Sequence, residues 1–164
     1  MTKAKKLNPE HIKAVLNLIN QGPYFQLLSM SVDELGLGLS QVSIGLEHKH
    51  LNLFNGLHGG VYASIIDTAA YWSCYGAMAE NAGFVSLDLK VDNLAPIRGG
   101  LLVARGRQIK VGRTICLAEA WVTDSTGRLL ASGTSKLMVT PGLQTIGQAM
   151  AAAGFTNMPS KFIE

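Results

Sequence analysis

Apolar residues near the start of the chain recur at the spacing of one helix face, at Ile12, Val15, Leu16 and Ile19. Asn8 precedes this run and suits a helix N-cap, and Pro9 suits the first helical position. Gly22 and Pro23 are typical of a helix end. We therefore predict a helix between Asn8 and Gly22.

Most of the remaining chain has the residue types and the turns of β-strands. Residues 29–46 predict two strands joined near Gly36-Leu37-Gly38. Glycine-containing turns separate four later strands, predicted at about 84–94, 101–110, 114–123 and 128–140. The last segment predicts a short helix around 143–153 and a loose tail.

A long apolar segment at 57–79 separates the two groups of strands. Its apolar and small residues surround the whole helical circumference, which predicts a helix buried on every side. This order of elements predicts an α+β fold, in which an antiparallel sheet of about six strands wraps around one central helix. We divide the chain into an N-terminal helix and lead-in (1–28), this domain (29–140) and a C-terminal helix and tail (141–164).

Composition narrows the classes of function. Of the 164 residues, 48% are apolar and 15% are charged, which favours a packed core over disorder. The net charge is +3, no dense Lys/Arg block is present and aromatic residues make up 7%, which argues against nucleic-acid binding. A mild basic excess suits an anionic small molecule. No apolar run reaches the ~20 residues of a membrane span.

Cys74 and Cys116 lie in apolar surroundings, without CxxC spacing or a neighbouring His cluster. We interpret them as buried hydrophobic residues in a reducing compartment, with no metal site. The N-terminal residues are basic but lack the apolar region of a signal peptide. We expect a cytoplasmic protein with no cofactor of its own.

Asp67 is the most informative polar residue, because its helical neighbours are small or apolar. A carboxylate buried without a partner costs several kcal/mol, so such a group is normally paired, protonated or functional. The helix start adds a second feature, His58-Gly59-Gly60. Backbone N–H groups at a helix start have no intrahelical acceptor, and glycines let a substrate oxygen approach them, as an oxyanion hole requires.

The spacing of these two features constrains how they could cooperate. Gly60 and Asp67 are seven residues apart, hence roughly 10 Å along one helix. One reacting carbon cannot lie ~3 Å from both groups. If both act on one substrate, they come from different protomers, which predicts a dimer with shared sites.

Together these motifs resemble a known family. Asn52, His58-Gly59-Gly60 and Asp67 are similar to the N-x5-HGG-x6-D pattern of hotdog acyl-CoA thioesterases, in the PaaI-type branch of the 4-hydroxybenzoyl-CoA thioesterase superfamily. The strand beginning at Ser86 and the closing strands with Gly127-Arg128-Leu129-Leu130-Ala131 also look like that branch. The resemblance covers roughly residues 30–140 and implies a hotdog fold.

The resemblance also implies roles. Asp67 would be the nucleophile or the general base of acyl-CoA hydrolysis, and Gly59 N–H would polarise the thioester carbonyl. Asn52 and His58 would orient the carbonyl or water from the protomer of Gly59, whereas Ser86 would come with Asp67 from the opposite one. CoA is then part of the substrate, and a homodimer or a tetramer of dimers is expected.

Other contacts are less constrained by the sequence. Gly60 is a second candidate for substrate binding at the helix start. Basic residues that could contact the CoA phosphates lie on the late strands, at Arg98, Arg105, Arg107, Lys110 and Arg113. Asn93 stands where this branch usually has an aromatic residue, so acyl-chain preference does not follow from the resemblance.

Two other functions remain open. Hotdog dehydratases or hydratases acting on acyl thioesters pair a His with an acidic residue, whereas the HGG-x6-D arrangement and Asn52 favour attack on a thioester carbonyl. A non-catalytic acyl-CoA-binding module would have no use for Asp67. Release of free thiol from a panel of acyl-CoAs separates these three functions.

Overall fold

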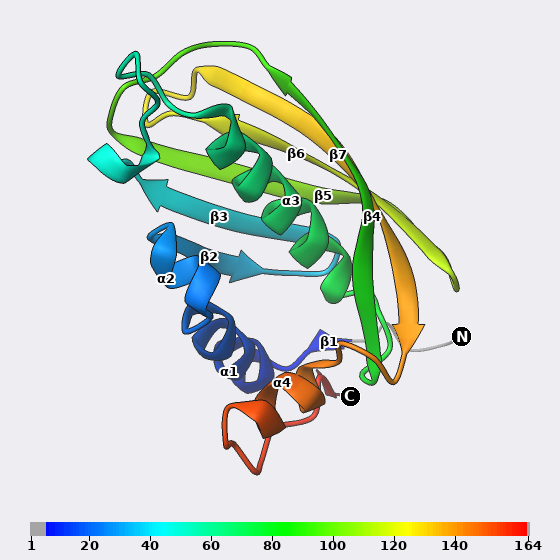
Figure 1. Cartoon of the computed structure of the whole chain (residues 1–164). Coiled ribbons are helices and arrows are strands. Elements are labelled where there is room, and N and C mark those ends of the chain that lie inside the picture. Colours follow the sequence, from blue (N-terminus) through cyan, green and yellow to red (C-terminus); the bar gives the residue numbers. More distant parts are fainter. Residues whose placement is uncertain (1–5, 164) are drawn as a thin grey trace.

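The computed structural model describes residues 6–163. Its main sheet has six antiparallel strands in the spatial order β2-β3-β5-β6-β7-β4. In chain order the strands are β2 (Met30–Leu35), β3 (Leu39–Gly45), β4 (Ala82–Asn93), β5 (Leu101–Val111), β6 (Ile115–Thr123) and β7 (Leu129–Pro141). The sheet wraps around helix α3 (Gly59–Tyr75), as Figure 1 shows. The predicted fold class is confirmed.

One face of α3 packs closely on the sheet. Ile65, Ile66 and Ala69 on this face are fully buried. Gly106 of β5 makes the contact possible, because a Cβ atom there would lie 2.1 Å from the Ala69 carbonyl oxygen. The remaining face is half-buried, so the prediction of burial on every side is wrong for the described part of the chain. Half-buried residues of α3 are Gly59, Ala63, Ser64, Asp67, Thr68, Tyr71 and Trp72.

Shorter elements lie around this core. They are β1 (Lys6–Leu7), α1 (Pro9–Asn20), α2 (Pro23–Leu27), the 3-10 helix η1 (His48–His50), α4 (Ile146–Ala152) and β8 (Phe162–Ile163). The Asn8 side chain caps α1 by accepting a hydrogen bond from Glu10 N at 3.1 Å. α1 and α2 lie beside β2 (Figure 1), and α2 was not predicted from the sequence.

The C-terminal tail, predicted to be loose, is held at its end. Lys161 is fully buried, and its Nζ donates to the carbonyl oxygens of Tyr75 at 2.5 Å and Met78 at 2.9 Å. These carbonyls belong to the end of α3 and the turn after it, where free carbonyls favour a cation. β8 pairs with β1, so both ends of the described chain meet near the end of α3 (Figure 1).

Two further predictions concern single features. Cys74 and Cys116 are free and buried, as expected. Across residues 6–163, no helix combines the length and apolar character needed to cross a membrane.

Candidate functional site

The start of α3 is organised by His58. This residue is the N-cap, and its Nδ1 accepts a hydrogen bond from Gly60 N at 2.9 Å. Because a backbone N–H only donates, Nδ1 carries no proton, and the neutral ring places its proton on Nε2. A Cβ atom at Gly60 would lie 2.9 Å from His58 Nδ1, so glycine makes room for the ring. The Gly60 N–H is therefore occupied by His58.

Gly59 differs from Gly60. It is the first residue of α3, and its N–H has no hydrogen-bond acceptor within residues 6–163. A Cβ atom here would lie 3.1 Å from Asn93 Nδ2, at the end of β4. Asn93 thus lies directly beside the candidate oxyanion donor, although sequence reasoning considered it only for acyl-chain preference. Gly59 retains the free donor that was predicted.

Asn52 lies in the loop before α3. Its Oδ1 accepts hydrogen bonds from Phe54 N at 2.9 Å and from Gly56 N at 3.2 Å. The side-chain oxygen is therefore committed to its own loop, and the Nδ2 hydrogens are the groups left to meet a ligand. Asn52, His58 and Gly59 line one open hollow at the start of α3. Three predicted site residues thus come together here.

Buried His50 stabilises this loop through hydrogen bonds. Its Nδ1 accepts from Glu47 N at 2.9 Å, and its Nε2 bonds to the Leu28 carbonyl oxygen at 2.8 Å. The His50 carbonyl oxygen accepts from His58 N at 2.9 Å. Both ring nitrogens are used, and the backbone carbonyl holds His58, the residue that caps α3. His50 is therefore a structural residue.

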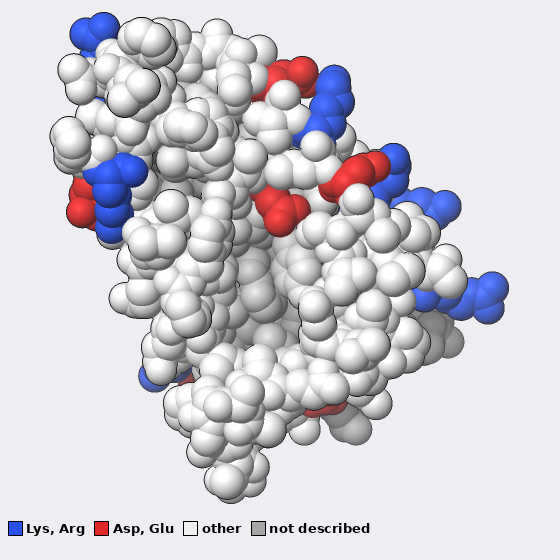
Figure 2. All heavy atoms as spheres, in the orientation of Figure 1, with Lys and Arg blue, Asp and Glu red and all other residues white. Residues whose placement is uncertain are grey.

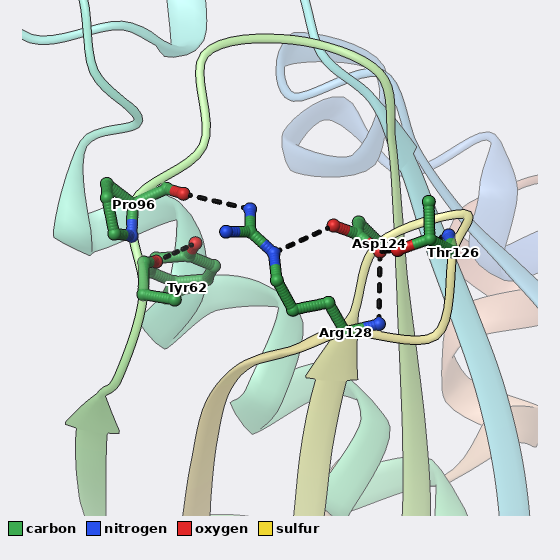
Figure 3. A network of polar contacts seen from close by, with 6 residues as sticks. Tyr62, Pro96, Asp124, Thr126 and Arg128 are labelled. Atoms are coloured by element: carbon green, nitrogen blue, oxygen red, sulfur yellow. Dashed lines mark hydrogen bonds and ion pairs between the residues drawn. The ribbon is translucent and has the colours of Figure 1, made fainter.

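The β4–β5 loop is tied to the start of α3 as well (Figure 3). Tyr62 of α3 donates its hydroxyl to the Ala95 carbonyl oxygen at 2.9 Å. Arg128 donates to the Pro96 carbonyl oxygen at 3.1 Å and to Asp124 Oδ2 at 3.1 Å. These bonds fix the position of the strand end that carries Asn93.

Asp67 lies eight residues after Gly59 along α3, on the half-buried face of this helix. Its Oδ1 accepts a hydrogen bond from Ser86 Oγ of β4 at 3.1 Å. Ser135 Oγ of β7 lies 3.3 Å from the same oxygen. The predicted pair of Asp67 and Ser86 therefore meets within one protomer. Ser135 was missed, because the sequence does not indicate which strand residues face the helix at this height.

Tyr71, one helical turn after Asp67, lines the same side of α3. Burial raises the pKa of its hydroxyl to about 12, and the negative charge of Asp67 acts in the same direction. The hydroxyl thus stays protonated at neutral pH and donates to the Phe84 carbonyl oxygen at 3.2 Å. Its ring packs edge-to-face on Phe84. Tyr71 is therefore part of the packing between α3 and β4.

The predicted site residues form two separate groups within one protomer. Asn52, His58, Gly59 and Gly60 lie at the start of α3, and Asp67 lies with Ser86 about 12 Å further along the helix, at 1.5 Å per residue. Arg113 belongs to neither group. It is exposed in the β5–β6 turn and lines a hollow with Met78 and Ala82, beyond the other end of α3.

Charged side chains are unevenly distributed over the surface shown in Figure 2. On the side of the molecule that carries α3, the face is mostly uncharged and hollowed along its centre. More charged side chains lie towards the side of β4 and β7, where Asp88 pairs with Lys136 and Asp92 pairs with Lys90, and a smaller charged group lies at the opposite edge. The part of this face that α3 lines thus carries few charged side chains.

Known proteins resemble this chain in sequence and in structure. Residues 54–131 match the family model described as the thioesterase superfamily. Human acyl-coenzyme A thioesterase 13 is 26% identical over 135 residues, which are 81% of this chain and 84% of that protein. The segment that matches the family model includes His58, Gly59 and Asp67.

Solved structures agree in fold. A thioesterase from Haemophilus influenzae superposes with a TM-score of 0.72 at 21% identity, covering 81% of this chain and 92% of that chain. A thioesterase family protein from Silicibacter pomeroyi gives a TM-score of 0.73 at 24% identity, covering 80% of this chain and 99% of that one. With its antiparallel sheet wrapped around α3, the chain has the hotdog fold of these thioesterases, and residues 54–131 match the thioesterase superfamily.

Proposed function

We propose that this protein hydrolyses acyl-CoA thioesters to the free acid and CoA. The observation that carries the proposal is that α3 holds both the unpaired Gly59 N–H, at its start, and the carboxylate of Asp67. Serine hydroxyls of β4 and β7 contact this carboxylate. The match to the thioesterase superfamily and the resemblance to an acyl-coenzyme A thioesterase support it. CoA enters as part of the substrate.

In this reaction the thioester carbonyl oxygen accepts a hydrogen bond from the Gly59 N–H. The donor lies at the positive end of α3 and stabilises the negative charge that develops on this oxygen. Asp67 acts in one of two ways. As a general base it takes a proton from water, whose oxygen adds to the carbonyl carbon; as a nucleophile it adds directly and forms an anhydride that water then opens. In both routes the C–S bond breaks, and the CoA sulfur leaves as thiolate and takes up a proton.

One protomer does not bring these groups to a single carbon atom. Gly59 and Asp67 are about 12 Å apart along a continuous helix, whereas each must lie ~3 Å from the reacting atoms. We therefore infer a site shared between two protomers, with Asn52, His58 and Gly59 from one and Asp67 and Ser86 from its partner. In this proposal, His58 Nε2–H and the Asn52 amide orient the carbonyl or the water.

The outer edge of β4 is the surface that suits this assembly. β4 is the last strand of the sheet, and within residues 6–163 nothing pairs with its outer edge. Leu87 on β4 and Leu94, the residue after β4, are about half exposed, at 52% and 55%. An open edge with apolar side chains favours pairing with another strand. A second copy of β4 would bring Asp67 and Ser86 near the partner.

Release of free thiol from a panel of aryl, medium-chain and long-chain acyl-CoAs tests the proposal. We expect hydrolysis of at least one class, with Asp67→Asn inactive on the same substrate. Binding without thiol release would indicate a non-catalytic acyl-CoA module and contradict the proposal. Hydration of an unsaturated acyl-CoA without thiol release would instead indicate a hydratase.

A further inference from the structure

A fully buried serine lies behind Asp67 and has no assigned role. Ser135 of β7 is 0% exposed, so bulk solvent does not reach its hydroxyl. The hydroxyl lies 3.0 Å from the Asp88 carbonyl oxygen and 3.3 Å from Asp67 Oδ1. It has one proton and two acceptors, so it serves one of them at a time.

This position depends on a β-bulge. The register between β4 and β7 shifts between Ser86 and Asp88, which leaves Leu87 as the extra residue. At the bulge, Lys136 N donates to Asp88 Oδ1 at 3.2 Å. The Asp88 carbonyl oxygen accepts from Ser135 Oγ at 3.0 Å. The bulge thus brings Ser86 and Ser135 to Asp67 from two neighbouring strands.

Both serine hydroxyls approach the same oxygen of Asp67. Oδ1 has Ser86 on its exposed side and Ser135 on its buried side, whereas Oδ2 has no hydrogen-bond donor within the described chain. A carboxylate held at one oxygen has a fixed rotation about its Cβ–Cγ bond. The unpaired Oδ2 is then the oxygen available to water or to the thioester.

We propose that Ser135 is a positioning residue that fixes Asp67 through Oδ1 and directs Oδ2 at the substrate. The inference rests on the proposed thioesterase function. When a substrate covers Asp67 and displaces water, the Ser135 hydroxyl remains as a donor to Oδ1. This donor is already in place, so little reorganisation is needed during the reaction.

The test compares Ser135→Ala with Ser73→Ala. Ser73 is a matched control, because it is also fully buried and its hydroxyl donates to the Ala70 carbonyl oxygen at 2.8 Å, away from Asp67. We expect Ser135→Ala to lower kcat by roughly 10-fold to 100-fold, the scale of one hydrogen bond to a charged group, with KM unchanged. Ser135→Cys, with a weaker donor of similar shape, should fall between serine and alanine. Ser73→Ala should lose stability but keep its kcat.

A second readout does not need turnover. In protein labelled with 13C at aspartate side chains, Ser135→Ala and Ser135→Cys should shift the Asp67 carboxyl resonance, whereas Ser73→Ala should leave it in place. An unmoved resonance, or equal kcat in Ser135→Ala and Ser73→Ala, would overturn the proposal. A wild-type protein that releases no thiol but shows the Ser135-dependent shift would contradict the thioesterase function and leave the Ser135–Asp67 contact supported.

Discussion

At the scale of single residues, the candidate site depends on which hydrogen-bond donors are already used. His58 Nδ1 occupies the Gly60 N–H, and Asn52 Oδ1 occupies two donors of its own loop. Gly59 N–H remains free within the described residues. A free donor at the positive end of a 17-residue helix is suited to stabilising an oxyanion.

Gly59→Val tests this donor sterically, because a backbone N–H cannot be removed by substitution. The branched side chain would push against Asn93 Nδ2 and enter the space of the thioester oxygen. We expect a folded protein with turnover lowered by at least ~10²-fold, near the loss of one oxyanion donor. Gly56→Ala is the control, since a Cβ there meets nothing closer than 3.7 Å. Wild-type turnover in folded Gly59→Val would mean that the carbonyl does not bind at Gly59.

Asp67→Asn tests the carboxylate with little change of shape. The asparagine Oδ1 can still accept from Ser86 and Ser135, so the fold and these contacts should persist. We expect kcat to fall by at least ~10²-fold, the scale of losing a general base or nucleophile. Asp92→Asn, at an exposed carboxylate paired with Lys90, should leave kcat unchanged. Near-normal turnover in folded Asp67→Asn would exclude Asp67 as the catalytic group.

Some of these residues were predictable from the sequence and others were not. Asp67, Gly59 and His58 were found because a polar residue in an apolar helix and glycines at a helix start are local signals. Ser135 and Asn93 reach the site through strand register and a β-bulge. Register depends on contacts between distant segments, so no local pattern indicates which serine or asparagine faces the helix.

At the scale of elements, the helix–sheet packing follows from the pattern of apolar residues. The predicted strands and the observed ones differ by one or two residues at most ends, because turn glycines delimit them. Helix α3 was predicted at 57–79 and is observed at 59–75. Its burial was overestimated, since small residues such as Ala63 are as compatible with a half-buried surface as with a core.

The β6–β7 turn is an element whose stability should depend on pH. Asp124 accepts hydrogen bonds from the Thr126 hydroxyl, from Thr126 N and from Arg128 (Figure 3). The Thr126 hydroxyl is the largest of the causes that lower the Asp124 pKa from 3.8 to about 2. A carboxyl whose folded pKa is lowered stabilises the fold fully above its ordinary pKa, and this contribution is lost as pH falls through about 2.

Asp124→Asn should therefore be less stable than wild type at neutral pH. The difference in free energy of unfolding should persist down to about pH 4 and shrink between pH 4 and pH 2. Urea unfolding at a series of pH values measures it. A difference that is constant across the range would show that the Asp124 charge does not stabilise the turn.

At the scale of the whole molecule, two half-sites lie on one helix. The fold keeps them apart, because α3 is continuous and both its ends are fixed, the first by His58 and His50 and the last by Lys161. The role of the tail was not predictable, since a lone lysine near the chain end gives no local sign that it caps a helix far away in sequence. Because α3 is rigid and keeps the Gly59 N–H apart from the Asp67 carboxylate, we expect two protomers to assemble to complete the proposed site.

The shared site is tested by mixing two inactive variants, Gly59→Val and Asp67→Asn. In a hybrid dimer one site combines the intact Gly59 of one protomer with the intact Asp67 of the other, whereas the second site carries both changes. Random exchange should restore about one quarter of wild-type activity, because half of the dimers are hybrids with one working site each. Differently tagged protomers measure the exchange.

The matched control is the double variant Gly59→Val/Asp67→Asn mixed with either single variant. No site in such a hybrid has both groups intact, so activity should stay at the background. Recovery in the first mixture and none in the control would be specific to a site built from two protomers. If exchange is complete and the first mixture stays inactive, each protomer must instead work alone. Gly59 and Asp67 would then have to act at separate points of the substrate, since α3 holds them about 12 Å apart.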